Sequence, residues 1–390
     1  MAIPAAVDKD RFLRIAAVSY EGSVFGWDVN TNETTLDCTL GFGFHATQGS
    51  LKAVAVSATG KYMVCGGMDE RIRIFNVSEN RTLGELTGHS GCITCLKFVG
   101  DKFIVSGSED NTLGIWRVQD WLCVHILGGH KAAITDIAVH PSGKLALSVS
   151  KDNTLKVWNL VQGRCAFTRR LHGHADKVEW CASGDMYSLV VGNELQVYNA
   201  CDNSCIGTVK FAARINQARF TNIGAAAAGG TNPGHYIAVV CEDRKMVIVD
   251  ATCKALTSPY SLDLALSGGR PRDMSSVMPA TVANNDVRDA LDGEGHSLVI
   301  ATSLGVVAVL SARALAEGNI QQAEDAGIVD EDPTGASFAM QAAASTTAEP
   351  RLTAVVAWNP TLKAIKVTKA DKRKIKSAVG GDSSEEEDEE

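Results

Sequence analysis

"HPSGKLALSVSKDNTLKVWNL", residues 140–160, is the stretch that decides the fold of this chain. Apolar residues alternate with small or polar ones from Leu145 to Val149, and they alternate again from Leu155 to Trp158. An alternation with a period of two is typical of half-buried strands. The polar residues 150–153 between the two runs are of the kind that reverses a chain between antiparallel strands. The stretch therefore predicts a β-hairpin.

The same pattern occurs once more, earlier in the chain, as "KFIVSGSEDNTLGIWRV" at residues 102–118. Asp110 recurs as Asp152, and Trp116 recurs as Trp158, 42 residues later in each case. Gly-His pairs precede both copies, and a third pair stands at residues 173–174. A period of about 40 to 45 residues that begins with Gly-His and carries a Trp near its end is typical of WD40 propeller blades. From these residues the chain is identified as a member of the WD40 family.

The length of the chain suits one propeller followed by a tail. Seven blades of about 42 residues need roughly 300 of the 390 residues, and a single blade cannot bury a sufficient core. We therefore predict an all-β fold, a seven-bladed WD40 β-propeller over residues 1–360 with an irregular insertion at 311–350. Residues 361–390 are predicted to form a disordered tail that is first basic and then acidic.

Strand patterns at the two ends of the chain lack partners of their own. Residues 12–40 supply three strands of a blade without its first strand, and residues 351–358, "RLTAVVAW", form a strand without neighbours. We expect the two ends to share one blade, because closing the ring removes the exposed edges of an open sheet. In the last blade the first strand, near residues 272–277, is weak, and the last strand is not legible.

The net charge of the chain is −8 at pH 7, and it is distributed unevenly. Residues 382–390 carry seven acids and residues 361–381 carry a net charge of +6, which leaves an acidic body in residues 1–360. An acidic body argues against diffuse binding to nucleic-acid phosphates. Eleven cysteines without a recognisable signal peptide predict free thiols in a reducing compartment. The sequence contains no run of 18 apolar residues, so we predict no membrane span.

Two sets of four residues match the hydrogen-bonded chain of WD40 blades. The resemblance implies that a Gly-His histidine, a strand serine, a turn aspartate and a strand tryptophan bond to one another inside the blade. An ionised aspartate accepts hydrogen bonds from the backbone and the imidazole, and the indole N–H needs an acceptor. A Ser-His-Asp hydrolase is the alternative, but groups fixed inside a blade would have no substrate pocket. We predict a structural role and no enzyme activity for the two sets, His89, Ser106, Asp110, Trp116 and His130, Ser148, Asp152, Trp158.

Two further patterns resemble metal sites but are predicted not to bind a metal. Cys92 and Cys95 have the CxxC spacing of zinc or redox sites. Residues i and i+3 of a strand point to opposite faces, however, and no second CxxC exists. His172 and His174 flank a glycine, but His174 is the Gly-His histidine of its blade. The glycines at residues 224–234 lack the Lys-Ser/Thr ending of a phosphate loop, and we expect no cofactor.

The tail carries two candidate signals. Ser383 and Ser384 each have an acidic residue three positions further on, a pattern that acid-directed kinases prefer, and phosphorylation would deepen the negative charge. The alternative is a tail that only improves solubility. The basic cluster fits a nuclear-import signal formed by Lys369, Lys372, Arg373, Lys374 and Lys376.

Three stretches resemble one WD40 family in particular. They are "SVFGWDV" at residues 23–29, "HSGCITCLKF" at residues 89–98 and the stretch at residues 140–167. They are similar to the family of the p21-activated-kinase-interacting WD40 protein and its fungal counterpart, a maintenance-of-killer factor needed for large ribosomal subunit assembly. The resemblance covers residues 12–360. The short, finally acidic tail and the insertions in the last two blades depart from the family pattern.

The resemblance implies a non-enzymatic scaffold of the nucleus and nucleolus that helps to place an assembly factor on precursors of the large ribosomal subunit. The implied partners are pre-large-subunit assembly factors and ribosomal proteins, with only indirect association with pre-rRNA. We expect no membrane association and a monomeric chain. The alternative is a signalling adaptor that binds and restrains a p21-activated kinase. The sequence does not assign partner-binding residues to either face of the propeller.

Overall fold

The computed structural model describes residues 12–31, 36–221, 236–250, 260–261, 270–277, 297–304, 306–311, 337–341 and 351–358. Within these ranges the chain forms strands, turns and bends, and none of them contains a helix long and apolar enough to cross a membrane. The strands assemble into seven antiparallel four-stranded sheets.

Each sheet is built from consecutive strands, except that the first sheet takes one strand from the C-terminal part of the chain. The first sheet contains β28 (Leu352–Trp358), β1 (Phe12–Ser19), β2 (Ser23–Thr31) and β3 (Leu36–His45). The second sheet contains β4 (Leu51–Val56), β5 (Tyr62–Gly67), β6 (Ile72–Asn76) and β7 (Arg81–Leu86). The third sheet contains β8 (Ile93–Val99), β9 (Phe103–Ser108), β10 (Leu113–Arg117) and β11 (Leu122–Leu127).

The remaining four sheets follow in chain order. The fourth sheet contains β12 (Ile134–Val139), β13 (Leu145–Ser150), β14 (Thr154–Asn159) and β15 (Arg164–Arg170). The fifth sheet contains β16 (Lys177–Trp180), β17 (Met186–Val191), β18 (Glu194–Asn199) and β19 (Cys205–Lys210). The sixth sheet contains β20 (Ile215–Thr221), β21 (Tyr236–Cys241), β22 (Lys245–Asp250) and β23 (Tyr260–Ser261). The seventh sheet contains β24 (Pro271–Val277), β25 (Ser297–Thr302), β26 (Val306–Ser311) and β27 (Ser337–Gln341).

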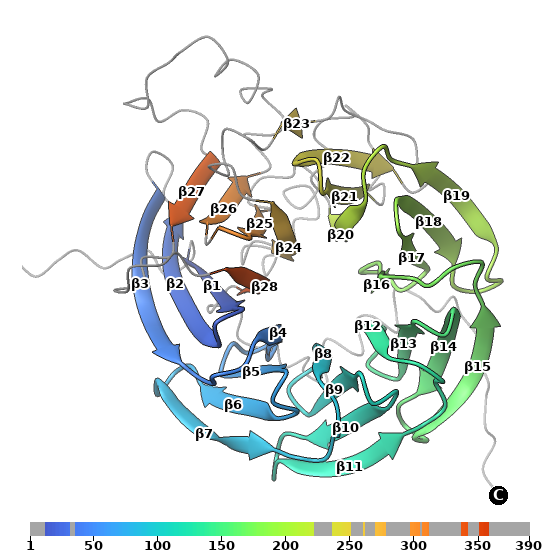
Figure 1. Cartoon of the computed structure of the whole chain (residues 1–390), viewed down its shortest axis with the longest axis horizontal. Coiled ribbons are helices and arrows are strands. Elements are labelled where there is room, and N and C mark those ends of the chain that lie inside the picture. Colours follow the sequence, from blue (N-terminus) through green and yellow to red (C-terminus); the bar gives the residue numbers. More distant parts are fainter. Residues whose placement is uncertain are drawn as a thin grey trace, which may run out of the picture.

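The sheets stand around a central axis, with one innermost strand of each sheet beside it (Figure 1). These innermost strands contact one another in the order β28, β4, β8, β12, β16, β20, β24 and back to β28. β28 pairs with β1 so that Val356 lies opposite Ala16. The all-β propeller predicted from the sequence is confirmed, and strands from the two ends of the described chain share one sheet and close the ring.

The hairpin predicted at residues 140–160 is the pair β13–β14, in which Leu147 lies opposite Val157. Its turn contains Asn153, whose φ of 59° is in the left-handed region. In the equivalent turn between β9 and β10, Asn111 has a φ of 69°. Asparagine tolerates this conformation better than most residues because its short polar side chain can hydrogen-bond locally. The repeated Asp-Asn pair therefore sets the same turn in both sheets.

The hydrophobic core lies in the seams between neighbouring sheets. Between the third and fourth sheets, Ile134, Ile137 and Trp158 are at most 1% exposed and pack against Val105 and Leu113. Full burial of one aliphatic side chain, such as that of Ile134, contributes about 1.5–3 kcal/mol. Because each seam takes side chains from two sheets, no sheet buries its apolar surface without its neighbours.

Polar side chains also join the first sheet to both of its neighbours. Thr353 Oγ1 donates a hydrogen bond to the carbonyl oxygen of Leu51 in β4 at 2.6 Å. On the other side, the backbone N–H of Val355 donates to Asp273 Oδ2 in β24 at 3.0 Å. Each of these bonds contributes about 1 kcal/mol net. The sheet that closes the ring is therefore bonded across both seams.

One expectation from the sequence is corrected by the strand pairing. The stretch 311–350, expected to be an irregular insertion, contains β27, which pairs with β26 so that Phe338 lies opposite Val309. The sequence of β27, SFAMQ, lacks a run of β-branched residues and follows an Ala-rich stretch, so its pattern is weak. The last strand of the sixth sheet is only Tyr260–Ser261. The predicted disordered tail, residues 361–390, lies outside the described residues.

Candidate interaction surface

The third sheet brings its four predicted residues together in one hydrogen-bonded chain. Trp116 Nε1 donates to Ser106 Oγ at 2.8 Å, and Ser106 Oγ lies 2.7 Å from His89 Nε2. His89 Nδ1 lies 2.8 Å from Asp110 Oδ2, and the backbone N–H of Ser90 donates to the same oxygen at 3.0 Å. An ionised Asp can only accept, so Nδ1 carries the imidazole hydrogen and Nε2 accepts from the serine hydroxyl.

The fourth sheet repeats this chain with nearly identical geometry. Trp158 Nε1 donates to Ser148 Oγ at 2.7 Å, and Ser148 Oγ lies 2.7 Å from His130 Nε2. His130 Nδ1 lies 3.0 Å from Asp152 Oδ2, and the backbone N–H of Lys131 donates to that oxygen at 2.8 Å. In both sheets the chain ties the loop before the innermost strand to the turn between the second and third strands.

The protonation states of this chain follow from burial and hydrogen bonding. Burial alone would raise the pKa of Asp152, but hydrogen bonds from the Thr154 hydroxyl, the Lys131 N–H and His130 lower it to about 2. Burial lowers the pKa of His130, and the neighbouring Asp152 opposes this effect only in part. The pKa of Asp110 is likewise lowered, because hydrogen bonds outweigh its burial. At neutral pH the aspartates are ionised and His130 is neutral.

All polar atoms that a hydrolase triad would need are occupied inside these sheets. Ser106 and Ser148 have no exposed surface, and each hydroxyl already bonds a tryptophan N–H and a histidine. A nucleophilic serine must reach the substrate while it bonds its base. The two sets therefore hold loops in place and do not present a serine to a substrate.

The second sheet does not assemble such a chain. His45 is exposed, and its Nδ1 lies 3.4 Å from Ser23 Oγ rather than near a turn carboxylate. Asp69, in the position of the turn aspartate, pairs with Arg73 instead. Cys65 stands in the position of the strand serine, and burial raises the pKa of its thiol to about 12. An arginine ion pair therefore replaces the imidazole in this sheet.

The fifth sheet also lacks the chain. The His174 side chain is 56% exposed, and its Nε2 lies 3.8 Å from Asp176 Oδ1. Tyr198 takes the place of the tryptophan, and its hydroxyl donates to Gln196 Oε1 at 2.9 Å. The guanidinium of Arg169 lies 4.2 Å from the centre of the Tyr198 ring. A cation–π contact and a local hydrogen bond replace the buried histidine here.

Among the residues that the structure describes, the other predicted residues have no arrangement that indicates a ligand. Cys92 and Cys95 are buried at the start of β8, and burial raises the pKa of Cys95 to about 12. Across the described residues, no three His, Cys, Asp or Glu side chains are grouped so that they could hold a metal ion. The candidates for nuclear import (Lys369, Lys372, Arg373, Lys374 and Lys376) and for phosphorylation (Ser383 and Ser384) lie outside the described residues.

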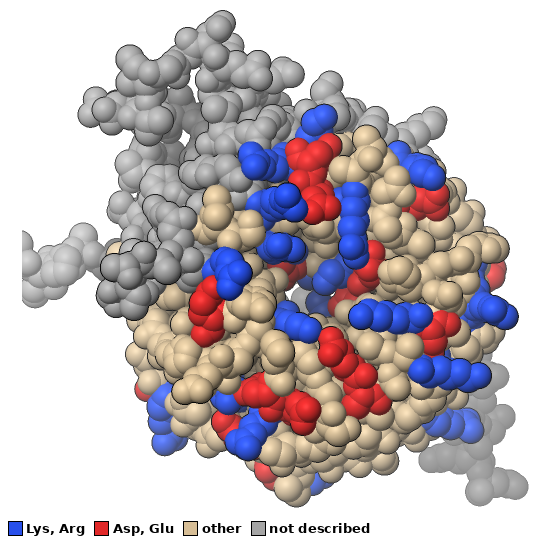
Figure 2. Space-filling view, viewed as in Figure 1, with Lys and Arg blue, Asp and Glu red and all other residues tan. Residues whose placement is uncertain are grey.

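A hollow of about 390 Å³ opens at one end of the central channel, where the innermost strands begin. We call this hollow, with the charged side chains that line it, the channel mouth. Charged side chains of both signs gather around the central opening of the propeller (Figure 2). Glu109 and Lys151 reach the mouth from turns that the two buried chains fix. Its cationic side chains are Lys52, Lys151, Lys177, Arg214 and Arg272, and its carboxylates are Glu109, Asp176 and Glu242.

The channel interior below the mouth carries charges that pair with one another. Arg219 lies 3.4 Å from Glu179 and 3.8 Å from Asp273. Burial raises the pKa of Glu179, whereas the charge of the neighbouring Arg219 lowers the pKa of Lys97. Buried ion pairs of this kind add little net stability, because desolvation offsets their attraction. They do fix the positions of the side chains under the mouth.

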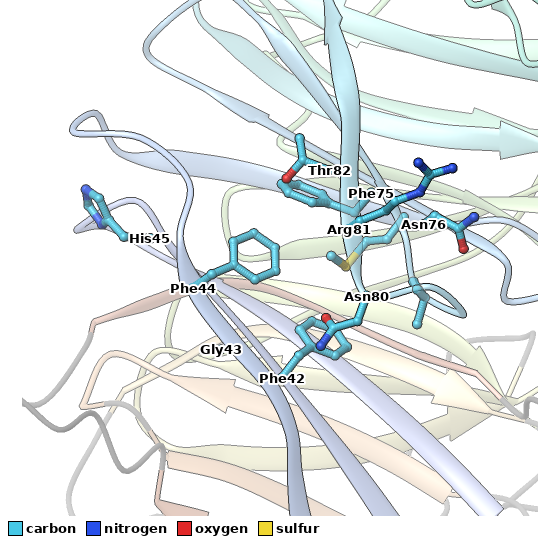
Figure 3. Close-up of a pocket in the computed structure, with 11 residues that line it drawn as sticks. Phe42, Gly43, Phe44, His45, Phe75, Asn76, Asn80, Arg81 and Thr82 are labelled. Atoms are coloured by element: carbon cyan, nitrogen blue, oxygen red, sulfur yellow. The ribbon is translucent and has the colours of Figure 1, made fainter.

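A second hollow, of about 380 Å³, lies where β3 meets β6 and β7. Its wall is aromatic: the rings of Phe44 and Phe75 point toward each other with centroids 4.6 Å apart, whereas His45 points away (Figure 3). Phe42 completes the wall and covers Gly26, where a Cβ atom would come within 2.2 Å of the Phe42 ring. This hollow belongs to the packing of the first two sheets against each other.

The channel mouth was not predicted from the sequence, although a signal for it exists. Lys52, Lys177 and Arg272 are each the first or second residue of an innermost strand. Charged residues at that position reach the mouth, because the innermost strands of all sheets begin at the same end of the channel.

Comparison with known proteins agrees with the fold. The WD40 family model, described as "WD domain, G-beta repeat", matches residues 37–76, 80–117 and 121–159. A p21-activated protein kinase-interacting protein 1-like protein of Gallus gallus is 38% identical over 218 residues, which are 56% of this chain and 58% of that protein. The human p21-activated protein kinase-interacting protein 1 is 36% identical over 224 residues, 56% of this chain and 57% of that protein.

The similarity extends to a yeast protein. Protein MAK11 of Saccharomyces cerevisiae is 35% identical over 218 residues, which are 49% of this chain and 52% of that protein. The matched region thus spans little more than half the length of these relatives. WD40 repeats therefore match three segments between residues 37 and 159, and the proteins to which the chain is similar include p21-activated protein kinase-interacting protein 1 and MAK11.

Proposed function

We propose that this chain is a non-enzymatic scaffold in large ribosomal subunit biogenesis, which docks an assembly factor on pre-ribosomal particles. The observation that carries the scaffold role is the contrast between the buried chains and the channel mouth. The Ser, His and Asp side chains bond one another and a tryptophan, a threonine and backbone N–H groups of their own sheet, whereas the turns that they hold expose charged side chains. A rigid ring that presents charged loops is suited to binding other proteins.

The similarity to MAK11 supports the ribosomal part of the proposal, because the family resemblance implies a factor needed for large-subunit assembly. We expect pre-large-subunit assembly factors and ribosomal proteins as partners, since the acidic body has a charge complementary to basic ribosomal proteins. Association with pre-rRNA would then be indirect. We further propose that the chain acts as a monomer in the nucleus and nucleolus, and that Lys372, Arg373, Lys374 and Lys376 direct its import.

Affinity purification of the full chain followed by mass spectrometry, with and without RNase, tests this proposal. We expect large-subunit precursors without RNase, and we expect the docked assembly factor to remain after RNase, because a protein contact holds it. A chain that recovers only cytosolic proteins under both conditions would contradict the scaffold role in the nucleolus.

A second candidate function is supported by the names of several relatives, which are described as p21-activated protein kinase-interacting proteins. In this alternative the propeller is a signalling adaptor that binds and restrains a p21-activated kinase. The same purification separates the two, because recovery of a p21-activated kinase without ribosomal proteins would favour the adaptor.

A further inference from the structure

The channel mouth contains more positive charge than its own carboxylates neutralise. Each of its three carboxylates already has a cationic partner. Lys52 Nζ lies 3.1 Å from Glu109 Oε1, and a guanidinium nitrogen of Arg214 lies 3.0 Å from Asp176 Oδ1. The third, Glu242, lies 2.9 Å from a guanidinium nitrogen of Arg270, which is itself not part of the lining.

Three cationic side chains of the mouth remain after this pairing. Lys151, Lys177 and Arg272 form no side-chain hydrogen bond and no ion pair with any described residue. Burial would lower the pKa of Lys177, but the charges of Asp136 and Asp273 raise it in spite of the opposing charge of Arg219, so the ammonium stays protonated. Lys151 and Arg272 are exposed.

We propose that the channel mouth binds an acidic segment of a partner protein, with Lys151, Lys177 and Arg272 as its anion-binding groups. These three residues come from the fourth, fifth and seventh sheets, so one bound segment would span the opening. The volume of about 390 Å³ accommodates a short run of side chains rather than a folded domain.

The distribution of charges favours a peptide over a nucleic-acid backbone. The three carboxylates are interleaved with the cations around the mouth, and a continuous phosphate backbone would have to pass them. A peptide carries separate carboxylates together with N–H donors, and those donors need acceptors. Asn216 lines the hollow and donates from Nδ2 to the carbonyl oxygen of Pro271 at 2.8 Å, and no described residue donates to its Oδ1, which can therefore act as an acceptor. A mixed set of cations and acceptors therefore matches an acidic peptide.

This inference does not rest on the proposed ribosomal function, because it is drawn from the charges of the mouth alone. The test is fluorescence anisotropy on the purified full chain, with fluorescein-labelled octaglutamate as the probe at low ionic strength. Lys151→Glu and Arg272→Glu are the informative variants, since both side chains are exposed and unpaired. Lys144→Glu is the matched control, because Lys144 is also exposed but precedes β13, at the opposite end of that strand from Lys151.

We expect each mouth variant to weaken octaglutamate binding about fivefold, since the charge reversal removes one attraction and adds one repulsion. Lys144→Glu should leave the affinity within about twofold of the original. Equal losses in Lys144→Glu and Lys151→Glu would overturn the proposal, as would tighter binding of octauridylate than of octaglutamate. The proposal would also be overturned if a chain that ends at residue 360 bound octaglutamate much more tightly than the full chain does. The acidic residues 382–390 of the chain itself would then be the occupant of the mouth.

Discussion

The third and fourth sheets differ from the fifth sheet in how they hold the loop before their innermost strand. In the third and fourth sheets, a buried histidine joins a strand serine to a turn aspartate. In the fifth sheet the equivalent His174 is 56% exposed, and Tyr198 stacks with Tyr187 at a centroid distance of 5.3 Å. All three sheets nevertheless pair their four strands in the same order. The buried chain therefore adds stability to individual sheets, and the fold does not require it in every sheet.

The same comparison separates residues that hold the ring from residues that hold one loop. In β28 the Thr353 hydroxyl and the Val355 backbone N–H bond to the two neighbouring sheets, whereas His89 and His130 bond within their own sheets. The loss in the free energy of unfolding should therefore be largest when a whole innermost strand is removed and smaller when one buried hydrogen-bonded chain is broken. It should be smallest when a contact of the fifth sheet is removed.

The largest effect is expected from removal of β28. A chain that ends at residue 350 loses the strand that pairs with β1 and buries Leu352 and Val355, so we expect a loss of several kcal/mol in the free energy of unfolding. A chain that ends at residue 360 keeps the strand and should melt like the full chain. Thermal melts followed by circular dichroism check this, and equal melting temperatures of the two truncations would contradict closure by a shared sheet.

A single substitution in the buried chain should have an intermediate effect. His130→Ala removes the acceptor of the buried Ser148 hydroxyl and one of the hydrogen-bond donors to Asp152, which costs about 1–3 kcal/mol. His174→Ala, the matched change in the fifth sheet, should cost less than about 0.5 kcal/mol because that side chain is exposed. Urea unfolding measures both values. Similar losses in the two variants would remove the distinction between the sheets.

The pH dependence of stability should reveal the ionised aspartate. The folded pKa of Asp152, about 2, is below its ordinary value of 3.8, so its contribution is fully present above that value and is lost as the pH falls toward 2. We expect the stability gap between the original chain and Asp152→Asn to narrow below about pH 4, by at most about 1 kcal/mol at pH 3, because solvent screens part of the interaction. Urea titrations between pH 3 and pH 6 follow the gap, and a constant gap would mean that the carboxylate does not titrate there.

The smallest effect is expected from the cation–π contact of the fifth sheet. Arg169→Ala removes the contact with Tyr198 and a hydrogen bond to Asn203 Oδ1 of 3.1 Å, and it should cost about 1 kcal/mol. Arg170→Ala is the control, because the neighbouring Arg170 is exposed and should cost less than about 0.5 kcal/mol. If Arg169→Ala unfolds like the control, another contact must replace the tryptophan in this sheet.

Local patterns predicted the hairpins and the two sets of buried residues, because the alternation and the Asp-Asn turns are encoded within a few adjacent residues. β27 escaped prediction because its sequence, SFAMQ, has few residues that favour strands, so its place depends on pairing with β26. The ion pair between Arg73 and Asp69, which stands where other sheets have a histidine, was not predicted either. To recognise this pair one must know the register of β6. The channel mouth joins residues as far apart as Lys52 and Arg272, and only closure of the ring brings them together.

The scaffold role in large-subunit biogenesis is tested most directly by depletion of the protein followed by sucrose-gradient analysis of ribosomal subunits. A factor that docks an assembly protein on large-subunit precursors should be needed for their maturation. We predict that free large subunits fall relative to small subunits, and that the full chain restores the ratio. An unchanged subunit ratio, with the protein in the cytosol and bound to a kinase, would contradict the scaffold and leave the signalling adaptor.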